Sequence, residues 1–243
     1  MPLAEINGIH IHHEIRGQGP PLLLILGTGG DVSAFPRLID SLAAHHQVVA
    51  FDNRGAGRSD RPDAPYSIQL MASDTFGVME AEGLDRAAVL GISLGGRIAM
   101  ELALCHPERV ERLILVSTSA RSVSSWRRRH LMAILATAFA RGPYRQPRYA
   151  FLRQMSASTG YDATARLGGL AMPTLILHGR SDRSVPLRLA QEMQAAIPGS
   201  RMVLFRGGHL FFLLREPARF LASVANFCRP TVDAPAQGPA PEI

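Results

Sequence analysis

The chain has 243 residues, with 26 basic and 20 acidic side chains and a formal net charge of +6. All 26 basic residues are arginines, which excludes Schiff-base lysine chemistry, pyridoxal-phosphate attachment and a P-loop. With 47% hydrophobic and 19% charged residues, the composition is that of a globular protein with a sizeable core. The length predicts one large domain, or one domain with an insertion.

No segment of the sequence indicates export, membrane insertion or nucleic-acid binding. Residues 1–13 lack an apolar signal-peptide core, and the longest apolar runs, residues 22–26 and 131–140, are much shorter than the ~20 residues that span a bilayer. Cys105 and Cys228 form no Cys-x-x-Cys pair, so we expect free, buried thiols in a reducing compartment. The expected location is the cytoplasm. Because no nucleic-acid motif accompanies the positive charge, we expect no nucleic-acid partner.

Strand and helix patterns alternate along the chain. Asn7-Gly8, between two isoleucines, predicts a two-residue hairpin turn that leads into an amino-terminal strand. Buried strands are predicted at residues 22–26, 48–51, 87–90, 113–116, 174–177 and 202–205. Helices are predicted at residues 35–44, 67–82, 94–105, 187–197 and 217–228, the second with Ser67 as its amino-terminal cap. The alternation predicts an α/β fold with a mostly parallel sheet flanked by helices.

The alternation breaks once, between residues 121 and 170, where helical patterns at 126–140 and 149–156 occur without a strand signal. We expect this segment to be a short, arginine-rich helical cap on a core formed by residues 1–120 and 171–228. Eight arginines lie within residues 121–161, which contain no acidic side chain. The proline-rich residues 229–243 have little to bury and are expected to form a disordered tail.

The segment Gly91-Ile92-Ser93-Leu94-Gly95 follows a predicted buried strand and opens a predicted helix. This G-x-S-x-G pattern places a serine on a sharp strand-to-helix turn, where its hydroxyl is exposed and the helix amino terminus stabilises negative charge. Larger residues two positions before and after the serine would collide across the turn. Ser93 is therefore a candidate nucleophile, and the alternative is an ordinary glycine-rich turn.

A serine nucleophile needs a base, and the base needs an acid that orients it. Asp182 comes shortly after the fifth predicted buried strand, and His209 comes shortly after the sixth. Ligands bind beyond the carboxyl ends of the strands in open α/β sheets. Ser93, Asp182 and His209 therefore form a candidate triad in the chain order Ser, Asp, His. His178, in the same region as Asp182, is expected to be structural.

These motifs together resemble the α/β-hydrolase fold family from about residue 6 to residue 228. The matching segments are residues 52–59 (Asp-Asn-Arg-Gly-Ala-Gly-Arg-Ser), 91–95, 173–182 and 208–209. The resemblance implies Ser93 as nucleophile, His209 as base and Asp182 as the acid that orients the base.

The same resemblance implies an oxyanion hole made of two main-chain N–H groups. One belongs to Leu94, the residue after the nucleophile, and the other to Thr28, in the loop after the first buried strand. The family often has His-Gly in this loop, where this chain has Leu26-Gly27.

No cofactor and no metal ion are expected. The glycine-rich residues 27–30 are not a dinucleotide fingerprint, because Val32 stands where the third glycine belongs. His10 and His12 share a strand face, with His13 beside them, but no cysteine or acidic residue joins them at zinc-like spacing. We expect these histidines to lie on the surface or on an edge strand.

The expected activity is hydrolysis of carboxylic ester or lactone bonds of small substrates through an acyl-enzyme intermediate. Residues 116–121, followed by Trp126 and Arg127, are similar to the corresponding stretch of 3-oxoadipate enol-lactone hydrolases, which act on a lactone with a free carboxylate. An anionic substrate that contacts the cap arginines is therefore an alternative. The opposite alternative is that these arginines face solvent.

Other activities stay open on the same triad, namely thioester hydrolysis, carbon–carbon bond hydrolysis and cofactor-free peroxidase chemistry. A ligand-binding module that keeps the fold without turnover is the non-enzyme alternative. We expect a small-molecule ester or lactone as partner and no stable membrane insertion, and the sequence leaves a homo-oligomer open.

Overall fold

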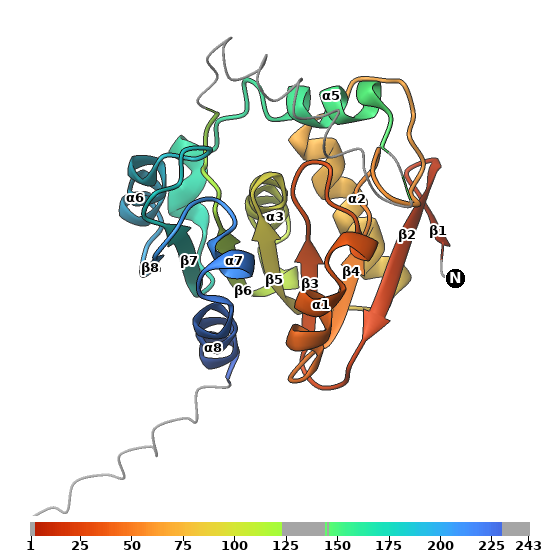
Figure 1. Cartoon of the computed structure of the whole chain (residues 1–243). Helices are drawn as coiled ribbons and strands as arrows, with labels where there is room; N and C mark the ends of the chain where they lie inside the picture. Colours follow the sequence, from red (N-terminus) through yellow and green to blue (C-terminus); the bar gives the residue numbers. More distant parts are fainter. Residues whose placement is uncertain (1–2, 123–143, 145, 230–243) are drawn as a thin grey trace, which may run out of the picture.

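A computed structural model describes residues 3–122, 144 and 146–229 of the chain. The expected tail from residue 230 onward and the whole of the helical pattern at residues 126–140, with Trp126, thus lie outside the described residues. Eight strands form one sheet in the order β1-β2-β4-β3-β5-β6-β7-β8 (Figure 1). They are β1 (Leu3–Ile6), β2 (Ile9–Arg16), β3 (Pro21–Ile25), β4 (Gln47–Phe51), β5 (Ala87–Ile92), β6 (Val110–Val116), β7 (Thr174–Gly179) and β8 (Arg201–Phe205).

The two amino-terminal strands run antiparallel to their neighbours, and all other neighbouring strands are parallel. The helices of the described chain are α1 (Pro36–Ala43), α2 (Ile68–Ala81), α3 (Leu94–Cys105), α5 (Arg148–Ala157), α6 (Leu187–Ala196), α7 (Phe211–Leu214) and α8 (Pro217–Cys228). None of them combines the length and the apolar character that a membrane crossing requires. The predicted α/β fold with a mostly parallel sheet is confirmed.

Hydrophobic side chains fill both faces of the sheet. In β3, Leu22 and Leu24 belong to the core cluster that contains α1 and α8, whereas Leu23 and Ile25 belong to the cluster that contains α2 and α3. All four side chains are fully buried. The continuous apolar run of this strand therefore reflects helices on both sides, since each face of a doubly covered strand needs apolar residues.

Two expectations about single residues are wrong. His12 and His13 are buried, because β2 lies between β1 and β4 and is not an edge strand; His10 alone of the three is exposed. Cys105 is exposed at the end of α3, and Cys228 is only partly buried.

The chain between β6 and β7 leaves the sheet and returns to nearly the same place. Arg121 and Asp162 form an isolated antiparallel bridge, and the N–H of Ala163 donates to the carbonyl of Ala120 at 2.9 Å. Between these points, α5 lies across the end of the sheet toward which β3 and β5 point (Figure 1). A helix of the predicted cap segment therefore lies above the carboxyl edge of the strands.

Candidate active site

Ser93 lies between β5 and α3 in a backbone conformation that non-glycine residues rarely adopt, with φ 56° and ψ −112°. The glycines on either side make this turn sterically feasible. A Cβ atom on Gly91 would lie 2.4 Å from the carbonyl oxygen of Gly95, and one on Gly95 would lie 2.1 Å from the carbonyl oxygen of Ile25. Both glycines of the G-x-S-x-G pattern are therefore sterically required.

The structure brings the three predicted side chains Ser93, His209 and Asp182 into one hydrogen-bonded series. Nε2 of His209 lies 3.0 Å from Oγ of Ser93, and Nδ1 of His209 lies 2.8 Å from Oδ2 of Asp182. Because a carboxylate only accepts hydrogen bonds, Nδ1 of the neutral imidazole carries the proton and Nε2 is left as an acceptor for the serine hydroxyl. The arrangement can thus withdraw a proton from Ser93.

Asp182 is buried in the loop after β7 and accepts several hydrogen bonds. Its Oδ1 accepts from the N–H groups of Ser184 at 2.7 Å and Val185 at 2.9 Å. Burial raises the pKa of Asp182, but the bonds from His209 and from the Val185 N–H outweigh it, so that the net pKa is lowered. The carboxyl group is therefore ionised at neutral pH and can orient the imidazole.

His178 lies beside this loop and is fully buried. Its Nε2 donates to the carbonyl of Val185 at 2.9 Å, and the same nitrogen is 3.7 Å from Oδ2 of Asp182. Burial lowers the pKa of His178, which favours the neutral ring. These contacts agree with a structural role in holding the loop. In the described chain, no cluster of three or more His, Cys, Asp and Glu could hold a metal ion.

The main-chain N–H groups of Thr28 and Leu94, both near Ser93, have no acceptor among the described residues. The loop after β3 passes directly beside the serine, since a Cβ atom on Gly27 would lie 3.2 Å from Cβ of Ser93 and 3.8 Å from its Oγ. Leu94 is the first residue of α3, where the helix dipole favours an anion. Thr28 and Leu94 therefore occupy the neighbourhood in which the sequence predicts the oxyanion hole.

Thr118 and Gln154 are among the polar residues near the site that were not predicted from the sequence. Thr118, just beyond β6, donates from Oγ1 to the carbonyl of Ser93 at 2.7 Å. Gln154, on α5, accepts a hydrogen bond of 3.0 Å from the N–H of Gly29. Two signals could have found Thr118: its position at the carboxyl end of a predicted strand and its place in the segment 116–121 that is similar to enol-lactone hydrolases. Nothing local in the sequence pairs Gln154 with Gly29.

Among the described residues, three arginines of the cap segment pair with acidic residues of the core, and one of them is Arg166, which donates to Glu101 on α3 at 2.6 and 3.1 Å. Arg121 donates to Glu192 on α6 through two bonds of 3.0 Å, and Arg153 donates to Asp63 at 3.0 and 3.3 Å. These pairs attach the cap segment to the core. Five further arginines of this segment lie outside the described residues: Arg127, Arg128, Arg129, Arg141 and Arg145.

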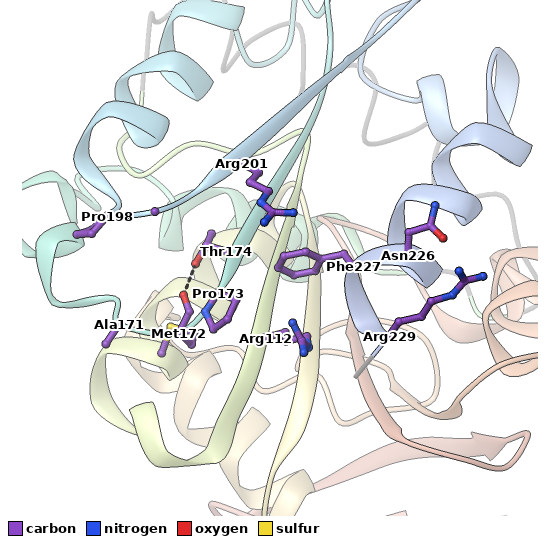
Figure 2. Close-up of a pocket in the computed structure, with 11 residues that line it drawn as sticks. Arg112, Ala171, Met172, Pro173, Thr174, Pro198, Arg201, Asn226, Phe227 and Arg229 are labelled. Atoms are coloured by element: carbon purple, nitrogen blue, oxygen red, sulfur yellow. Dashed lines mark hydrogen bonds between the residues drawn. The ribbon is translucent and has the colours of Figure 1, made fainter. Parts of the chain in front are cut away.

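A pocket of about 400 Å³ lies at the end of the sheet opposite to the Ser93 site (Figure 2). Arg112, Arg201, Arg229 and Phe227 line it, where β6, β7 and β8 begin and α8 ends. Arg229 caps the carboxyl end of α8, where a positive side chain is stabilising. None of the residues that line this pocket belongs to the Ser93 site.

Comparison with known proteins agrees with this fold. A family model described as "alpha/beta hydrolase fold" matches residues 20–138. A protein of Azorhizobium caulinodans named "Putative carbamate hydrolase RutD" is 32% identical over 94% of this chain and 98% of its own length. The enol-lactonase from Burkholderia xenovorans LB400 is 28% identical, with a TM-score of 0.84 over 93% of this chain and 99% of that structure. Est816, described as an N-acyl homoserine lactone degrading enzyme, is 26% identical, with a TM-score of 0.81 over 93% of this chain and 100% of that structure.

Proposed function

Because the chain belongs to the α/β-hydrolase fold family, we propose that it is a serine hydrolase of small carboxylic esters or lactones. One observation carries the proposal: Ser93, His209 and Asp182 are connected by hydrogen bonds of 3.0 and 2.8 Å. Next to Ser93, the N–H groups of Thr28 and Leu94 have no acceptor in the described chain. Nucleophile, base, orienting acid and anion-binding groups are the parts that acyl transfer needs.

In the first half-reaction, Oγ of Ser93 attacks the acyl carbon while Nε2 of His209 takes the hydroxyl proton. The negative charge that develops on the carbonyl oxygen is stabilised by the N–H groups of Thr28 and Leu94. The bond from the acyl carbon to the alcohol oxygen then breaks, and His209 gives its proton to the leaving alcohol. With a lactone, that alcohol stays attached to the acyl group.

In the second half-reaction, water attacks the acyl-enzyme and His209 takes a proton from it. The bond between the acyl carbon and Oγ of Ser93 breaks, the serine recovers its proton from His209, and the carboxylic acid leaves. Asp182 keeps the imidazole in one tautomer and stabilises the imidazolium that forms in both halves.

Two of the relatives support a lactone as substrate, since their names describe an enol-lactonase and an enzyme that degrades N-acyl homoserine lactones. Arg121 and Arg153 are already paired with Glu192 and Asp63, so these two offer little to an anionic substrate. These two arginines therefore give no support to the anionic enol-lactone alternative.

A carbamate is the second candidate, supported by the RutD relative at 32% identity. The same triad can act on it, since a carbamate also presents an acyl carbon to a serine nucleophile. The difference is a nitrogen on that carbon, which His209 must protonate if the carbon–nitrogen bond breaks.

The test is a substrate panel with the wild-type protein and Ser93→Ala. The panel contains p-nitrophenyl esters of increasing chain length, γ-lactones, an N-acyl homoserine lactone, an anionic enol-lactone and a small carbamate. We expect Ser93→Ala to lose a factor of at least ~10³ in kcat and to lose labelling by a fluorophosphonate. Unchanged turnover in Ser93→Ala would overturn the proposal. Absence of both turnover and labelling in the wild type would favour a ligand-binding module.

A further inference from the structure

We propose that Gln154 of α5 is a positioning residue that holds the oxyanion loop, residues 26–30, in the geometry needed for acyl transfer. It would do so by fixing the main chain beside Thr28, whose N–H is the proposed oxyanion donor. The inference rests on the proposed function. It gives the cap segment a part in the chemical step as well as in covering the site.

The Gln154 side chain is buried and uses both ends of its amide. The residue has no exposed surface. Its Oε1 accepts from the N–H of Gly29 at 3.0 Å, and its Nε2 donates to the carbonyl of Arg54 at 2.9 Å. Burying an amide is costly unless both ends are paired, and here each partner permits only one orientation of the group.

Three consecutive peptide groups of the oxyanion loop are each held by a hydrogen bond. The carbonyl of Leu26 accepts from Nδ2 of Asn53 at 3.0 Å. The carbonyl of Gly27 accepts from the N–H of Gly30 at 3.0 Å, which fixes the peptide group that carries the Thr28 N–H. The third bond, from the N–H of Gly29 to Gln154, fixes the peptide group that follows Thr28.

These bonds have different sources. The first two come from the core and from the loop itself, whereas the third comes from the cap segment, 125 residues farther along the chain. Removing it would free the peptide group after Thr28 to rotate. An oxyanion donor works because it is already aimed at the position of the developing charge, so added freedom weakens it.

Gln154 is itself held by a buried partner. Its acceptor belongs to Arg54, whose buried guanidinium forms an ion pair with the buried Asp74, with Nη2 2.6 Å from Oδ1. A positioning residue must be more rigid than the group that it positions. The ion pair with Asp74 holds Arg54, and Arg54 in turn holds the end of the Gln154 amide that points away from the loop.

A matched control, Gln146 of the cap segment, contacts the same loop. Gln146 also packs against Gly29, since a Cβ atom on that glycine would lie 3.2 Å from Oε1 of Gln146. Gln146 is buried as well, but no hydrogen bond joins it to the oxyanion loop among the described residues. Replacing either glutamine by methionine keeps its length and removes its amide.

The experiment measures kcat and KM for p-nitrophenyl acetate in the full-length wild type, Gln154→Met and Gln146→Met, together with the affinity of a boronic acid that forms a tetrahedral adduct with serine. We expect Gln154→Met to lower kcat by ~10- to 100-fold, with a KM within about 3-fold of wild type. The boronic acid should bind more weakly by a similar factor. Gln146→Met should stay within about 3-fold of wild type in all three quantities.

Gln154→Glu is a second variant, which keeps the proposal testable if Gln154→Met fails to fold. A protonated glutamic acid has both the acceptor and the donor of glutamine, whereas the ionised form has no donor for the Arg54 carbonyl. The ratio of its kcat to that of wild type should therefore fall as pH rises. A purely structural role would leave this ratio flat after correction for the folded fraction.

The possible results are distinct. Wild-type kcat in Gln154→Met, an equal loss in Gln146→Met, or a flat pH ratio for Gln154→Glu would each overturn the positioning role. If the wild type shows no hydrolysis that depends on Ser93, the proposed function fails, and that result is recognised before any Gln154 variant is measured.

Discussion

The hydroxyl of Ser117 donates a hydrogen bond of 2.8 Å to the main-chain oxygen of His209. Ser117 follows β6, is fully buried and has φ 48°, a value uncommon outside glycine. Its neighbour Thr118 bonds the carbonyl of Ser93 in the same way. The end of one strand thus holds the main chain of both the proposed nucleophile and the proposed base.

Ser117→Ala should therefore affect turnover as well as stability. We expect kcat to fall several-fold at unchanged KM, and the free energy of unfolding to fall by about 1 kcal/mol, because a partly buried acceptor loses its partner. Steady-state kinetics and urea unfolding measure the two effects. Ser223→Ala, which removes an exposed bond to Arg219 on α8, is the control. Equal kcat values in the two variants would contradict the prediction.

Asp182→Asn should reverse the tautomer of His209. An asparagine oxygen can still accept from Ser184 and Val185, which turns its amide nitrogen toward Nδ1 of His209. Nε2 would then carry the proton and could no longer accept one from Ser93. We expect kcat to fall by ~10³- to 10⁴-fold with the fold intact. A loss below 10-fold, with an unchanged circular dichroism spectrum, would argue against Asp182 as the orienting acid.

Gly95→Ala should prevent the strand-to-helix turn from forming. The added methyl group would lie 2.1 Å from the main-chain oxygen of Ile25, which neither strand nor helix can relieve cheaply. We expect a loss of more than about 4 kcal/mol in the free energy of unfolding, or no folded protein. Gly168→Ala, at a glycine with open space around it, should change stability by less than about 0.5 kcal/mol. Comparable thermal midpoints for Gly95→Ala and Gly168→Ala would show that position 95 does not require glycine.

Buried histidines should make the protein less stable in mild acid. Burial lowers the pKa of His178 and of His46. The unfolded chain then binds protons more readily below about pH 6.5, so the stability present above that pH is lost as pH falls toward the folded-state values. Each group can contribute up to about 1.4 kcal/mol per pH unit in that window.

Urea unfolding at pH 7, 6 and 5.5 checks this prediction. His46→Gln should make the dependence on pH shallower, whereas replacement of its exposed neighbour His45 by glutamine should have a smaller effect. A free energy of unfolding that rises on acidification over this range would be the opposite of the expected sign.

Arg121→Gln and Arg153→Gln should not change the preference between charged and uncharged esters. Both arginines form partly exposed ion pairs, with Glu192 and Asp63. Such pairs contribute at most about 1 kcal/mol to stability. We expect the ratio of kcat/KM for an anionic ester to that for a neutral ester to stay within about 2-fold of wild type. A selective loss of the anionic ester would instead place one of these arginines near the substrate.

The parts of the fold that follow from local patterns were predictable. The continuous apolar run of β3 predicted a strand covered on both faces, and Ser67 caps α2 as its sequence position indicates, accepting from the N–H of Leu70 at 3.0 Å. The helix α7 was missed because four apolar residues are too few to show a helical period. The burial of His12 depended on strand order, which no local pattern encodes.

The candidate site also has a part that could be predicted from the sequence and a part that could not. Ser93, Asp182 and His209 could be named because each directly or shortly follows a recognisable strand, and the carboxyl ends of parallel strands meet at one edge. The role of Gln154 depends on a hydrogen bond to Gly29 across 125 residues, and the bond from Ser117 to His209 spans 92. Contacts of this range follow from the assembled tertiary structure, so a single sequence does not indicate them.

The bridge between Arg121 and Asp162 also bears on how such a protein can be re-engineered. Because the excursion from the sheet closes where it opened, its length can change with little strain on β6 or β7, at a loop-closure cost of only about 0.6 kcal/mol per doubling. A segment from another hydrolase can thus be grafted between these two residues to alter substrate range. The graft must supply a buried amide for the N–H of Gly29, because a transplanted cap without one would change specificity and rate together.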